Sequence, residues 1–333
     1  MLVVGGGIAG VSLLYHLARR GMDAILVERA HLASGASGRN AGFMLAGVAD
    51  CYAEAVRMYG RSKAREVWAI TNENHDLSIE AAAGQDVGHR RLGSITMAAG
   101  DAERRQLEES DQLLREDGFD SHWDGEALLN PRDGEVDPAS LVGAIARQAR
   151  AGAIREGVNV TAIEPGGEDV TVRAGGDACR AGVVVLATNA YTPLLVSGVK
   201  IQPVRAQMLA STPVSTTVCS APTYSHFGYR YWRQLPSGEV LIGGWRDTSK
   251  DTELTYEDEP SDGIQAHLEA KLAEMAPGAA AARRWAGIMG FTESGLPLAG
   301  RLDGRPNVRL CAGFNGHGMG FAFMTAKRVV EEH

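Results

Sequence analysis

The feature that most restricts the fold of this chain is a glycine-rich turn at Gly5–Gly10, close to its start. The apolar residues Leu2–Val4 predict a short strand before the turn, and apolar residues recurring from Ile8 to Arg20 predict a helix after it. Ala24–Glu28 is typical of a second, buried strand of a parallel sheet. This strand–turn–helix–strand unit indicates a doubly wound α/β fold.

The turn and the acid that follows it predict a dinucleotide site. Gly5 allows the tight turn, Gly7 lets the backbone approach a pyrophosphate, and Gly10 lets helix and strand pack closely. The pyrophosphate then lies against free N–H groups at the helix N-terminus. Glu28 ends the second strand, where its carboxylate can accept a hydrogen bond from a ribose hydroxyl and disfavours the 2′-phosphate of NADP. The motif alone leaves NAD and FAD open.

Two further glycine-rich segments favour FAD. In Ala33–Met44, small residues and the hydroxyls of Ser34 and Ser37 let backbone N–H groups close over a diphosphate and an extended flavin. Gly313–Gly320 follows a predicted strand at Val308–Cys311 and precedes the last predicted helix, so it forms a second anion site. One helix N-terminus can face the diphosphate, and the other can face a flavin carbonyl on which negative charge develops during reduction.

The order of the predicted elements indicates two intergrown domains. βαβ pieces at both ends and in the middle of the chain are interrupted by segments rich in antiparallel strands. This pattern predicts an α/β protein with a Rossmann-like FAD-binding domain assembled from separated segments, and an inserted substrate domain built on a mixed, largely antiparallel sheet. We assign residues 1–84, 132–200 and 287–333 to the FAD-binding domain, and residues 85–131 and 201–286 to the substrate-binding domain.

Three further segments carry specific structural expectations. Asp137 is typical of a helix N-cap, and we expect that helix to run toward Arg155. The acidic stretch Asp247–Asp262 is expected to be an exposed loop. Arg205 is expected to stabilise the junction between the two domains.

Charge and composition exclude several classes of function. Lys and Arg total 33 against 41 Asp and Glu, a formal net charge of −8 without a basic tract, which argues against a nucleic-acid or anionic-membrane partner. No apolar run approaches the roughly 18 residues of a membrane span, and glycines and arginines interrupt the apolar start, so we expect no signal peptide. The four cysteines are too far apart for a Cys-x-x-Cys element, so we expect a cytoplasmic protein without a metal site.

Eight stretches of the sequence resemble the D-amino-acid oxidase/glycine oxidase/sarcosine oxidase family of FAD-dependent oxidoreductases. They are VVGGGIAG at 3–10, ASGASGRNAG at 33–42, DGEVDP at 133–138, VVVLATNAYT at 183–192, PVRAQM at 203–208, YWRQLPSGEVLIGG at 231–244, GIMGFTESGLPLAG at 287–300 and GFNGHGMG at 313–320. They span the chain in the order that the family uses. The resemblance implies a flavin domain, a substrate domain on a mixed sheet, and oxidation of the C–N bond of an amine or amino acid.

The glycine motifs and the resemblance together give the candidate cofactor-binding residues. These are Gly5, Gly7, Ile8, Ala9, Gly10, Glu28, Arg29, Ala36, Ser37, Arg39, Asn40, Ala41, Gly42, Phe43, Val160, Thr188, Asn189, Gly287, Ile288, Gly313, Phe314, Asn315, Gly316, Gly318 and Met319. Monomeric sarcosine oxidases tether the flavin through a cysteine where this chain has Met289, so the resemblance implies non-covalent FAD. Glycine oxidases hold the substrate carboxylate with an arginine at that same place, and sarcosine oxidases use a lysine where this chain has Gly320.

The usual carboxylate anchors of the family are therefore missing, and other side chains become candidates. His317 is the candidate catalytic residue, which would stabilise reduced flavin or assist oxygen reduction; the alternative is a packing histidine that bonds the backbone. The candidate substrate-binding residues are Tyr231, Arg233, Met289 and His317, and strand alternation places Tyr231 and Arg233 on one face. The substrate either has no carboxylate near its amine, or Arg233 or Arg230 takes over the anchor.

The sequence thus predicts a glycine-oxidase-like, FAD-dependent oxidase of a small amine or amino acid, such as an N-substituted glycine. Hydride transfer to flavin N5 gives an imine and, with molecular oxygen as acceptor, hydrogen peroxide. The alternatives are a dehydrogenase that uses a quinone or protein acceptor, a flavin monooxygenase, and a flavin-binding accessory subunit without its own chemistry. A homo-oligomer stays open.

Overall fold

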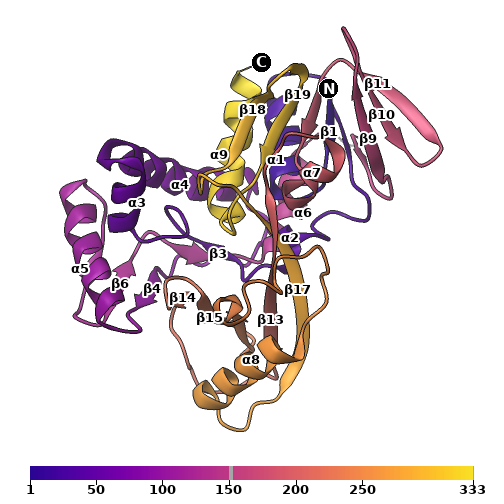
Figure 1. The fold of residues 1–333 in the computed structure, drawn as a ribbon. Coiled ribbons are helices and arrows are strands. Elements are labelled where there is room, and N and C mark those ends of the chain that lie inside the picture. The colour runs from indigo at the N-terminus through magenta and orange to yellow at the C-terminus, as the bar shows by residue number, and fades with distance from the viewer. Residues whose placement is uncertain (150–152, 333) are drawn as a thin grey trace.

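A six-stranded sheet gathers strands from both ends and the middle of the chain (Figure 1). The structure is a computed structural model that describes residues 1–149 and 153–332. The sheet order is β18-β19-β12-β1-β2-β8. The strands are β1 (Leu2–Val4), β2 (Ile25–Val27), β8 (Ile154–Arg155), β12 (Val184–Leu186), β18 (Leu298–Leu302) and β19 (Arg305–Ala312). Of the five pairings in this sheet, β18 with β19 is antiparallel and the other four are parallel, as the βαβ pattern predicted.

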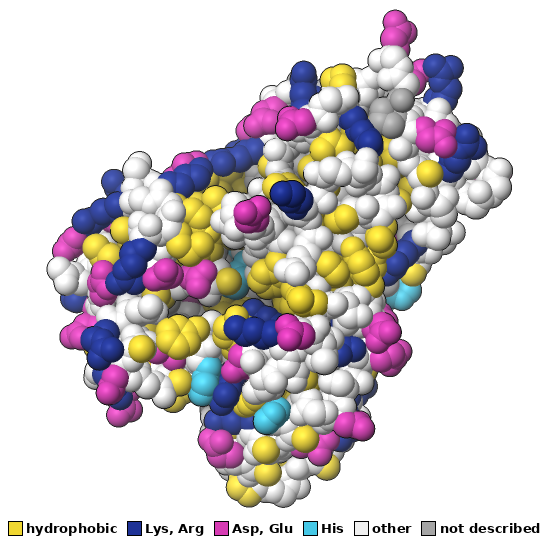
Figure 2. Space-filling view, viewed as in Figure 1, with side chains coloured by type: hydrophobic (Ala, Val, Ile, Leu, Met, Phe, Trp, Pro, Cys, Tyr) yellow, Lys and Arg dark blue, Asp and Glu magenta, His cyan; other side chains and the backbone are white. Residues whose placement is uncertain are grey.

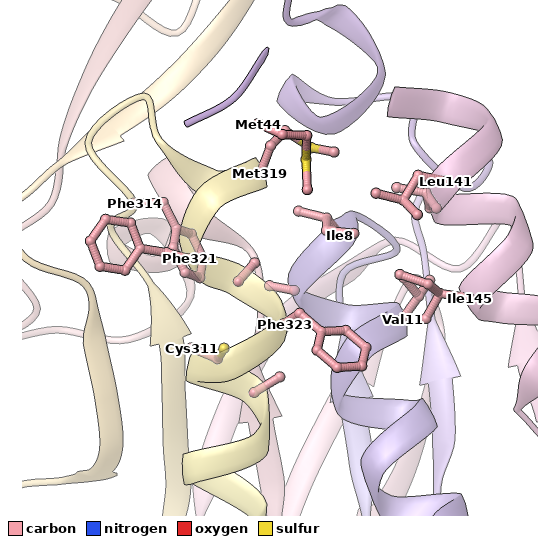
Figure 3. Close-up of a cluster of buried hydrophobic side chains, with 14 of the residues drawn as sticks. Ile8, Val11, Met44, Leu141, Ile145, Cys311, Phe314, Met319, Phe321 and Phe323 are labelled. Atoms are coloured by element: carbon pink, nitrogen blue, oxygen red, sulfur yellow. The ribbon is translucent and has the colours of Figure 1, made fainter. Parts of the chain in front are cut away.

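Three helices bury their apolar faces between themselves and this sheet. They are α1 (Ile8–Arg19), α6 (Pro138–Gln148) and α9 (Gly318–Glu331). Figure 3 shows Val11 of α1 facing Ile145 of α6, with Phe323 of α9 beside them. Val11 and Ile145 are fully buried. This packing fixes the N-termini of α1 and α9 next to each other at one edge of the sheet.

The helix that begins after Asp137 is shorter than predicted. The Asp137 carboxylate accepts a hydrogen bond from the backbone N–H of Ser140 at 2.7 Å, which confirms the predicted N-cap. However, α6 ends at Gln148, and Ile154–Arg155 forms an edge strand paired with β2. Since that strand continues the parallel sheet, tertiary pairing outweighs local helical preference there.

An eight-stranded, largely antiparallel sheet forms the second layer, in the order β17-β13-β16-β15-β14-β4-β6-β5. Its strands are β4 (Ser94–Met97), β5 (His122–Trp123), β6 (Ala127–Asn130), β13 (Gln202–Ser211), β14 (Thr223–Ser225), β15 (Arg230–Gln234), β16 (Val240–Gly244) and β17 (Ala281–Phe291). The β14–β4 pair is parallel, so the sheet is mixed. Helix α8 (Asp262–Met275) packs its apolar side chains against this sheet. The predicted fold class is confirmed.

The remaining elements surround these two sheets. A three-stranded sheet of β9 (Val160–Pro165), β10 (Val170–Ala174) and β11 (Asp177–Ala181) projects at the upper right of Figure 1. Helices α3 (Tyr52–Tyr59), α4 (Arg61–Ala81) and α5 (Asp101–Glu116) form the lobe at the left. The short elements are α2 (Ala36–Arg39), α7 (Thr192–Leu195), the 3-10 helices η1 (Asn189–Tyr191) and η2 (Arg246–Thr248), and the paired strands β3 (Phe43–Met44) and β7 (Gly134–Glu135).

The division into two domains stays a prediction, and the sheets support it. All strands of the six-stranded sheet come from the segments assigned to FAD binding. The strands of the eight-stranded sheet come from the segments assigned to substrate binding, except that β17 runs across the proposed boundary at residue 287.

The acidic stretch Asp247–Asp262 is held down more firmly than an exposed loop would be. The Glu253 carboxylate is buried and pairs with Arg205 on β13, with 2.8 Å between Nη2 and Oε1. Asp258 pairs with Arg39 at 2.5 Å. The buried arginine needs this carboxylate as a charge partner. Arg205 therefore anchors a loop of its own predicted domain, whereas the Arg39–Asp258 pair joins the two predicted domains.

Within the described ranges, no helix combines the length and the apolar character required to cross a bilayer.

Candidate cofactor and substrate cavity

A cavity of about 430 Å³ lies between the two large sheets. Its walls come from the N-terminal turns of α1 and α9, the segment that contains α2, the helix η1 and the strands β13, β15 and β17. Figure 2 shows hydrophobic side chains gathered in the middle of one face, with charged side chains mostly around its edges. Apolar walls with a few polar groups are typical of a ligand site.

The first glycine turn forms a cradle that no larger residue fits. A Cβ atom at Gly10 would lie 1.8 Å from the carbonyl oxygen of Gly5, and one at Gly5 would lie 2.7 Å from that of Ala187. A Cβ atom at Gly7 would lie 2.6 Å from the hydroxyl of Ser37. The backbone is thus bare where α1 begins, and the first N–H groups of a helix have no partner within it. This arrangement suits a pyrophosphate.

Charged side chains define the far end of the cavity. The Glu28 carboxylate accepts hydrogen bonds from the backbone N–H groups of Gly6 at 2.7 Å and Ala30 at 2.9 Å. The guanidinium of Arg29 lies 4.4 Å from the ring centroid of Tyr191, which also lines the cavity. The turn thus fixes Glu28 at the position where a ribose is expected. Tyr191 was not among the predicted site residues, although it follows the predicted Asn189 closely.

Asparagine side chains hold the second glycine turn in place at the opposite end. The side-chain oxygen of Asn189 accepts hydrogen bonds from the N–H groups of Gly313 at 2.9 Å and Phe314 at 3.3 Å. The side-chain oxygen of Asn315 accepts one from the N–H of Thr292 at 2.8 Å. These bonds tie η1, β17 and the start of α9 together, so the N-terminus of α9 faces the same cavity as that of α1.

The residues present fit FAD. The cavity combines a bare backbone cradle at one helix N-terminus, a carboxylate at the ribose position and a second helix N-terminus at the other end. An extended dinucleotide with a flavin ring can use all three, because each helix N-terminus favours negative charge.

The structure brings most of the predicted cofactor-binding residues to this cavity. Those that line it are Gly5, Gly7, Ile8, Ala9, Glu28, Arg29, Ala36, Ser37, Arg39, Asn40, Ala41, Phe43, Val160, Thr188, Asn189, Gly287, Ile288, Phe314, Asn315, Gly316, Gly318 and Met319. Gly10, Gly42 and Gly313 do not line it; each permits a close backbone or side-chain approach behind the wall. Arg39 lines the cavity but donates to Asp258 and to backbone carbonyls.

Arg233 does not line the cavity, contrary to the prediction. Its side chain is buried and pairs with Glu135 on β7, with 3.6 Å between Nη1 and Oε2. Tyr231, on the same face of β15, does reach the cavity. Strand alternation therefore predicted the shared face correctly, but it did not predict the Glu135 carboxylate that covers Arg233. The other candidate anchor, Arg230, lies outside the cavity wall and faces Asp247 at 3.8 Å.

Arg246, which the sequence analysis missed, is the arginine that lines the substrate side. It follows β16 in η2, and its guanidinium carbon lies 4.4 Å from the ring centroid of Tyr229 and 5.6 Å from that of Phe291. Among the described residues, no carboxylate forms an ion pair with Arg246. Trp245 before it has a φ of 62°, a left-handed conformation that turns the chain into the cavity. An arginine two residues after the Gly-Gly end of a predicted strand was the available signal.

His317 caps α9 and borders the cavity as a neutral imidazole. Burial lowers the pKa of His317, with a smaller contribution from the positive charge of Arg246. Its Nδ1 lies 3.3 Å from the carbonyl oxygen of Asn315. Because a carbonyl only accepts hydrogen bonds, Nδ1 carries the proton and Nε2 keeps a free lone pair. Met289 also lines the cavity, as predicted. No cluster of metal-ligating side chains occurs in residues 1–149 and 153–332.

Known proteins resemble this chain in sequence and in fold. Residues 1–332 match the family model described as "FAD dependent oxidoreductase" (DAO). The chain is 27% identical to the probable oxidoreductase OrdL of Rhizobium meliloti (strain 1021), over 99% of this chain and 81% of that protein. It is 24% identical to a glycine oxidase of Bacillus licheniformis, over 99% and 91%. The crystal structure of glycine oxidase from Geobacillus kaustophilus has the same fold, with a TM-score of 0.83 and 21% identity over 99% of this chain and 93% of that chain.

Proposed function

This chain belongs to the DAO family of FAD-dependent oxidoreductases, and from that premise we propose that it oxidises the C–N bond of a small amine that carries a carboxylate. An N-substituted glycine is the simplest such substrate. FAD is the cofactor. The relative named as a glycine oxidase supports the amine class of substrate.

The observation that carries the carboxylate in this proposal is Arg246. It is a half-buried cation on the cavity wall, stacked on aromatic rings and without a carboxylate partner among the described residues. A partly desolvated guanidinium favours an anion with two oxygens, because its planar fork donates two parallel hydrogen bonds. The other arginines near this end, Arg233 and Arg205, already have buried carboxylate partners.

The chain's own residues would hold the cofactor and orient the substrate. Gly5–Ala9 and Ser37 would bind the diphosphate, Glu28 the ribose, and the turn from Phe314 to Met319 the flavin. When bound, FAD accepts a hydride from the carbon next to the amine nitrogen. Arg246 fixes the carboxylate, and the rings of Tyr224 and Tyr231 exclude water around the amine.

His317 completes the proposed mechanism as a proton acceptor. The free lone pair of Nε2 accepts a proton from the substrate ammonium, which leaves the neutral amine from which oxidation starts. The lowered pKa of His317 keeps its imidazole neutral at physiological pH, so Nε2 is free to take the proton, which it then passes on to water. The imine product is then hydrolysed in water.

Anaerobic mixing of the FAD-loaded protein with N-methylglycine, glycine and single D- and L-amino acids tests the proposal. We expect N-methylglycine to bleach the visible flavin bands, and air to restore them with formation of hydrogen peroxide. Bleaching without rapid reoxidation in air would indicate a dehydrogenase with a quinone or protein acceptor. Bleaching by NADPH or NADH alone would indicate a monooxygenase, and no bleaching at all would indicate an accessory subunit.

A further inference from the structure

A second, smaller cavity of about 90 Å³ opens beside the substrate end of the first. We call it the side chamber; it lies between α3, α5 and the strands β4 and β6. Six residues line both cavities, namely Leu45, Ala49, Tyr224, Phe227, Gly228 and His317. The volume accommodates several water-sized groups, so the extension is large enough for a short side chain of a ligand.

The side chamber has a strongly negative lining. Its walls include the carboxylates of Asp50, Glu54, Glu103 and Asp133, and no Lys or Arg of the described chain lines it. Glu103 is 2% exposed and Asp133 is 3% exposed. Two nearly inaccessible carboxylates thus border a cavity whose lining has no Lys or Arg side chain to balance their negative charge.

Neutral donors alone hold these two buried carboxylates. Asp133 accepts hydrogen bonds from the N–H of Ala46 at 2.9 Å and the hydroxyl of Ser94 at 2.6 Å. Glu103 accepts two from the backbone N–H groups of Ala99 and Phe227. Neither forms an ion pair with a described cation, and a carboxylate has about four acceptor sites, so each keeps unused capacity.

A buried carboxylate without a cation is costly, and a cationic ligand group would remove that cost. Burial raises the pKa of Asp133 to about 7, because the buried site disfavours the charged form of the carboxyl group. Arg91, whose charge acts on Asp133 from a distance, is already paired with Asp76 at 2.7 Å.

We propose that the side chamber binds a positively charged end of the substrate's N-substituent, so that the substrate is an N-substituted glycine whose substituent ends in an ammonium group. This inference rests on the proposed function. Arg246 and the side chamber then select opposite charges at the two ends of one molecule, with the reacting amine between them beside His317. His317 lies at the junction because it lines both cavities, 6.4 Å from Tyr224 between ring centroids.

Binding of two matched, non-oxidisable probes tests this charge selection. The probes are (2-aminoethylthio)acetate and (propylthio)acetate. They have the same length, and a thioether sulfur replaces the reacting amine nitrogen in both. Each is titrated into the oxidised holoenzyme, and the shift of the visible flavin spectrum gives its Kd. We expect the aminoethyl probe to bind about tenfold or more tightly, since its ammonium can donate charge-assisted hydrogen bonds to the chamber carboxylates and the terminal methyl group of the propyl probe cannot. Equal affinity of the two probes would overturn the proposal.

Two chamber variants and one control locate the effect. Asp133→Asn keeps the shape of the side chain, with its amide oxygen accepting from Ala46 and its NH2 group donating to the Ser94 hydroxyl oxygen, and it should reduce the preference for the aminoethyl probe to about threefold or less. Asp50→Asn is the second variant of the side chamber, at an exposed position of its lining. It should also reduce the preference, and it replaces Asp133→Asn as the test if that variant does not fold. Glu108→Gln, on an exposed position of α5 outside the chamber, should leave it unchanged. An undiminished preference in both chamber variants would place the cation elsewhere.

The same experiments separate this inference from the proposed function. N-methylglycine has no tail, so its bleaching of the flavin depends on the proposed function alone. Bleaching together with equal probe affinities would retain the function and reject the chamber. A clear probe preference without bleaching by any amine would retain the chamber and reject the function.

Discussion

Arg233 and Arg246 flank strand β16 in the sequence and have opposite surroundings. Arg233 is covered by Glu135 of β7, whereas Arg246 is stacked on Tyr229 at the cavity wall. Alternation along β15 correctly predicted which face Arg233 occupies. It could not predict that β7, about a hundred residues earlier in the chain, supplies a carboxylate to that face. The identity of the anchor therefore depends on tertiary pairing that the local pattern does not contain.

The substitution Arg246→Met should remove the carboxylate anchor and keep the length of the side chain. We expect KM for N-methylglycine to rise about a hundredfold. A hydrogen bond to a charged group contributes ~1.5–3 kcal/mol, and every 1.4 kcal/mol is about a factor of ten in affinity. Flavin content and melting temperature should stay unchanged. Arg283→Met, an exposed arginine of β17, is the matched control. Steady-state kinetics that show the same KM in both variants would reject Arg246 as the anchor.

Asp133 should make stability depend on pH. Burial raises its pKa from 3.8 to about 7, although the hydrogen bonds from Ser94 and Ala46 and the charge of Arg91 oppose the rise. The folded state therefore holds the proton more tightly than the unfolded state, and this stabilisation is complete below the unfolded pKa and lost as the pH rises through about 7.

The substitution Asp133→Asn mimics the protonated form at every pH. Thermal melts should show the variant gaining stability relative to the wild type between about pH 4 and about pH 8. Tyr224 contributes to the same surroundings but titrates far above this range. A difference in melting temperature that does not change with pH would contradict the assigned surroundings of Asp133.

At the scale of elements, local signals predicted the glycine turn well and the short strands poorly. The turn at Gly5–Gly10 combines a strand, a helix and three positions that tolerate no Cβ, all within one short segment. By contrast, β3, β5 and β7 have two residues each and exist only through their partners. Strands of two residues are too short to show an alternation of apolar and polar side chains, so the sequence did not reveal that Glu135 of β7 covers Arg233.

Gly10→Ala should disrupt the first turn. Its Cβ would meet the carbonyl oxygen of Gly5 at 1.8 Å, and backbone atoms cannot give way there as a flexible side chain could. We expect loss of bound FAD or of soluble protein. Gly263→Ala in the first turn of α8 faces open space and should be neutral or slightly stabilising. Absorbance of the purified variants at equal protein concentration measures their flavin content; full FAD occupancy in Gly10→Ala would contradict the cradle.

At the scale of the whole molecule, the two large sheets divide the proposed work. The six-stranded sheet presents two helix N-termini to one cavity, and the eight-stranded sheet closes it with Tyr224, Tyr231 and Arg246. Sequence motifs revealed the first part because glycine turns are local. The second part depends on how β13 to β17 pair and on which side chains they turn inward, so only Tyr231 and Met289 of that wall were predicted as substrate contacts.

The holoenzyme should release its flavin on acid precipitation. Met289 occupies the position where a tethering cysteine would stand, and a thioether forms no such bond with a flavin. All yellow colour should move to the supernatant as FAD. Colour retained in the pellet would show a covalent link and would contradict the interpretation of Met289.

The proposed function depends on recognition of the amine through its carboxylate. Anaerobic rapid mixing of the holoenzyme with N-methylglycine, and separately with dimethylamine at the same concentration, tests it most directly, because the two differ only by that carboxylate. We expect N-methylglycine to reduce the flavin and dimethylamine to leave it oxidised. Equal reduction by both amines, or by neither, would contradict it.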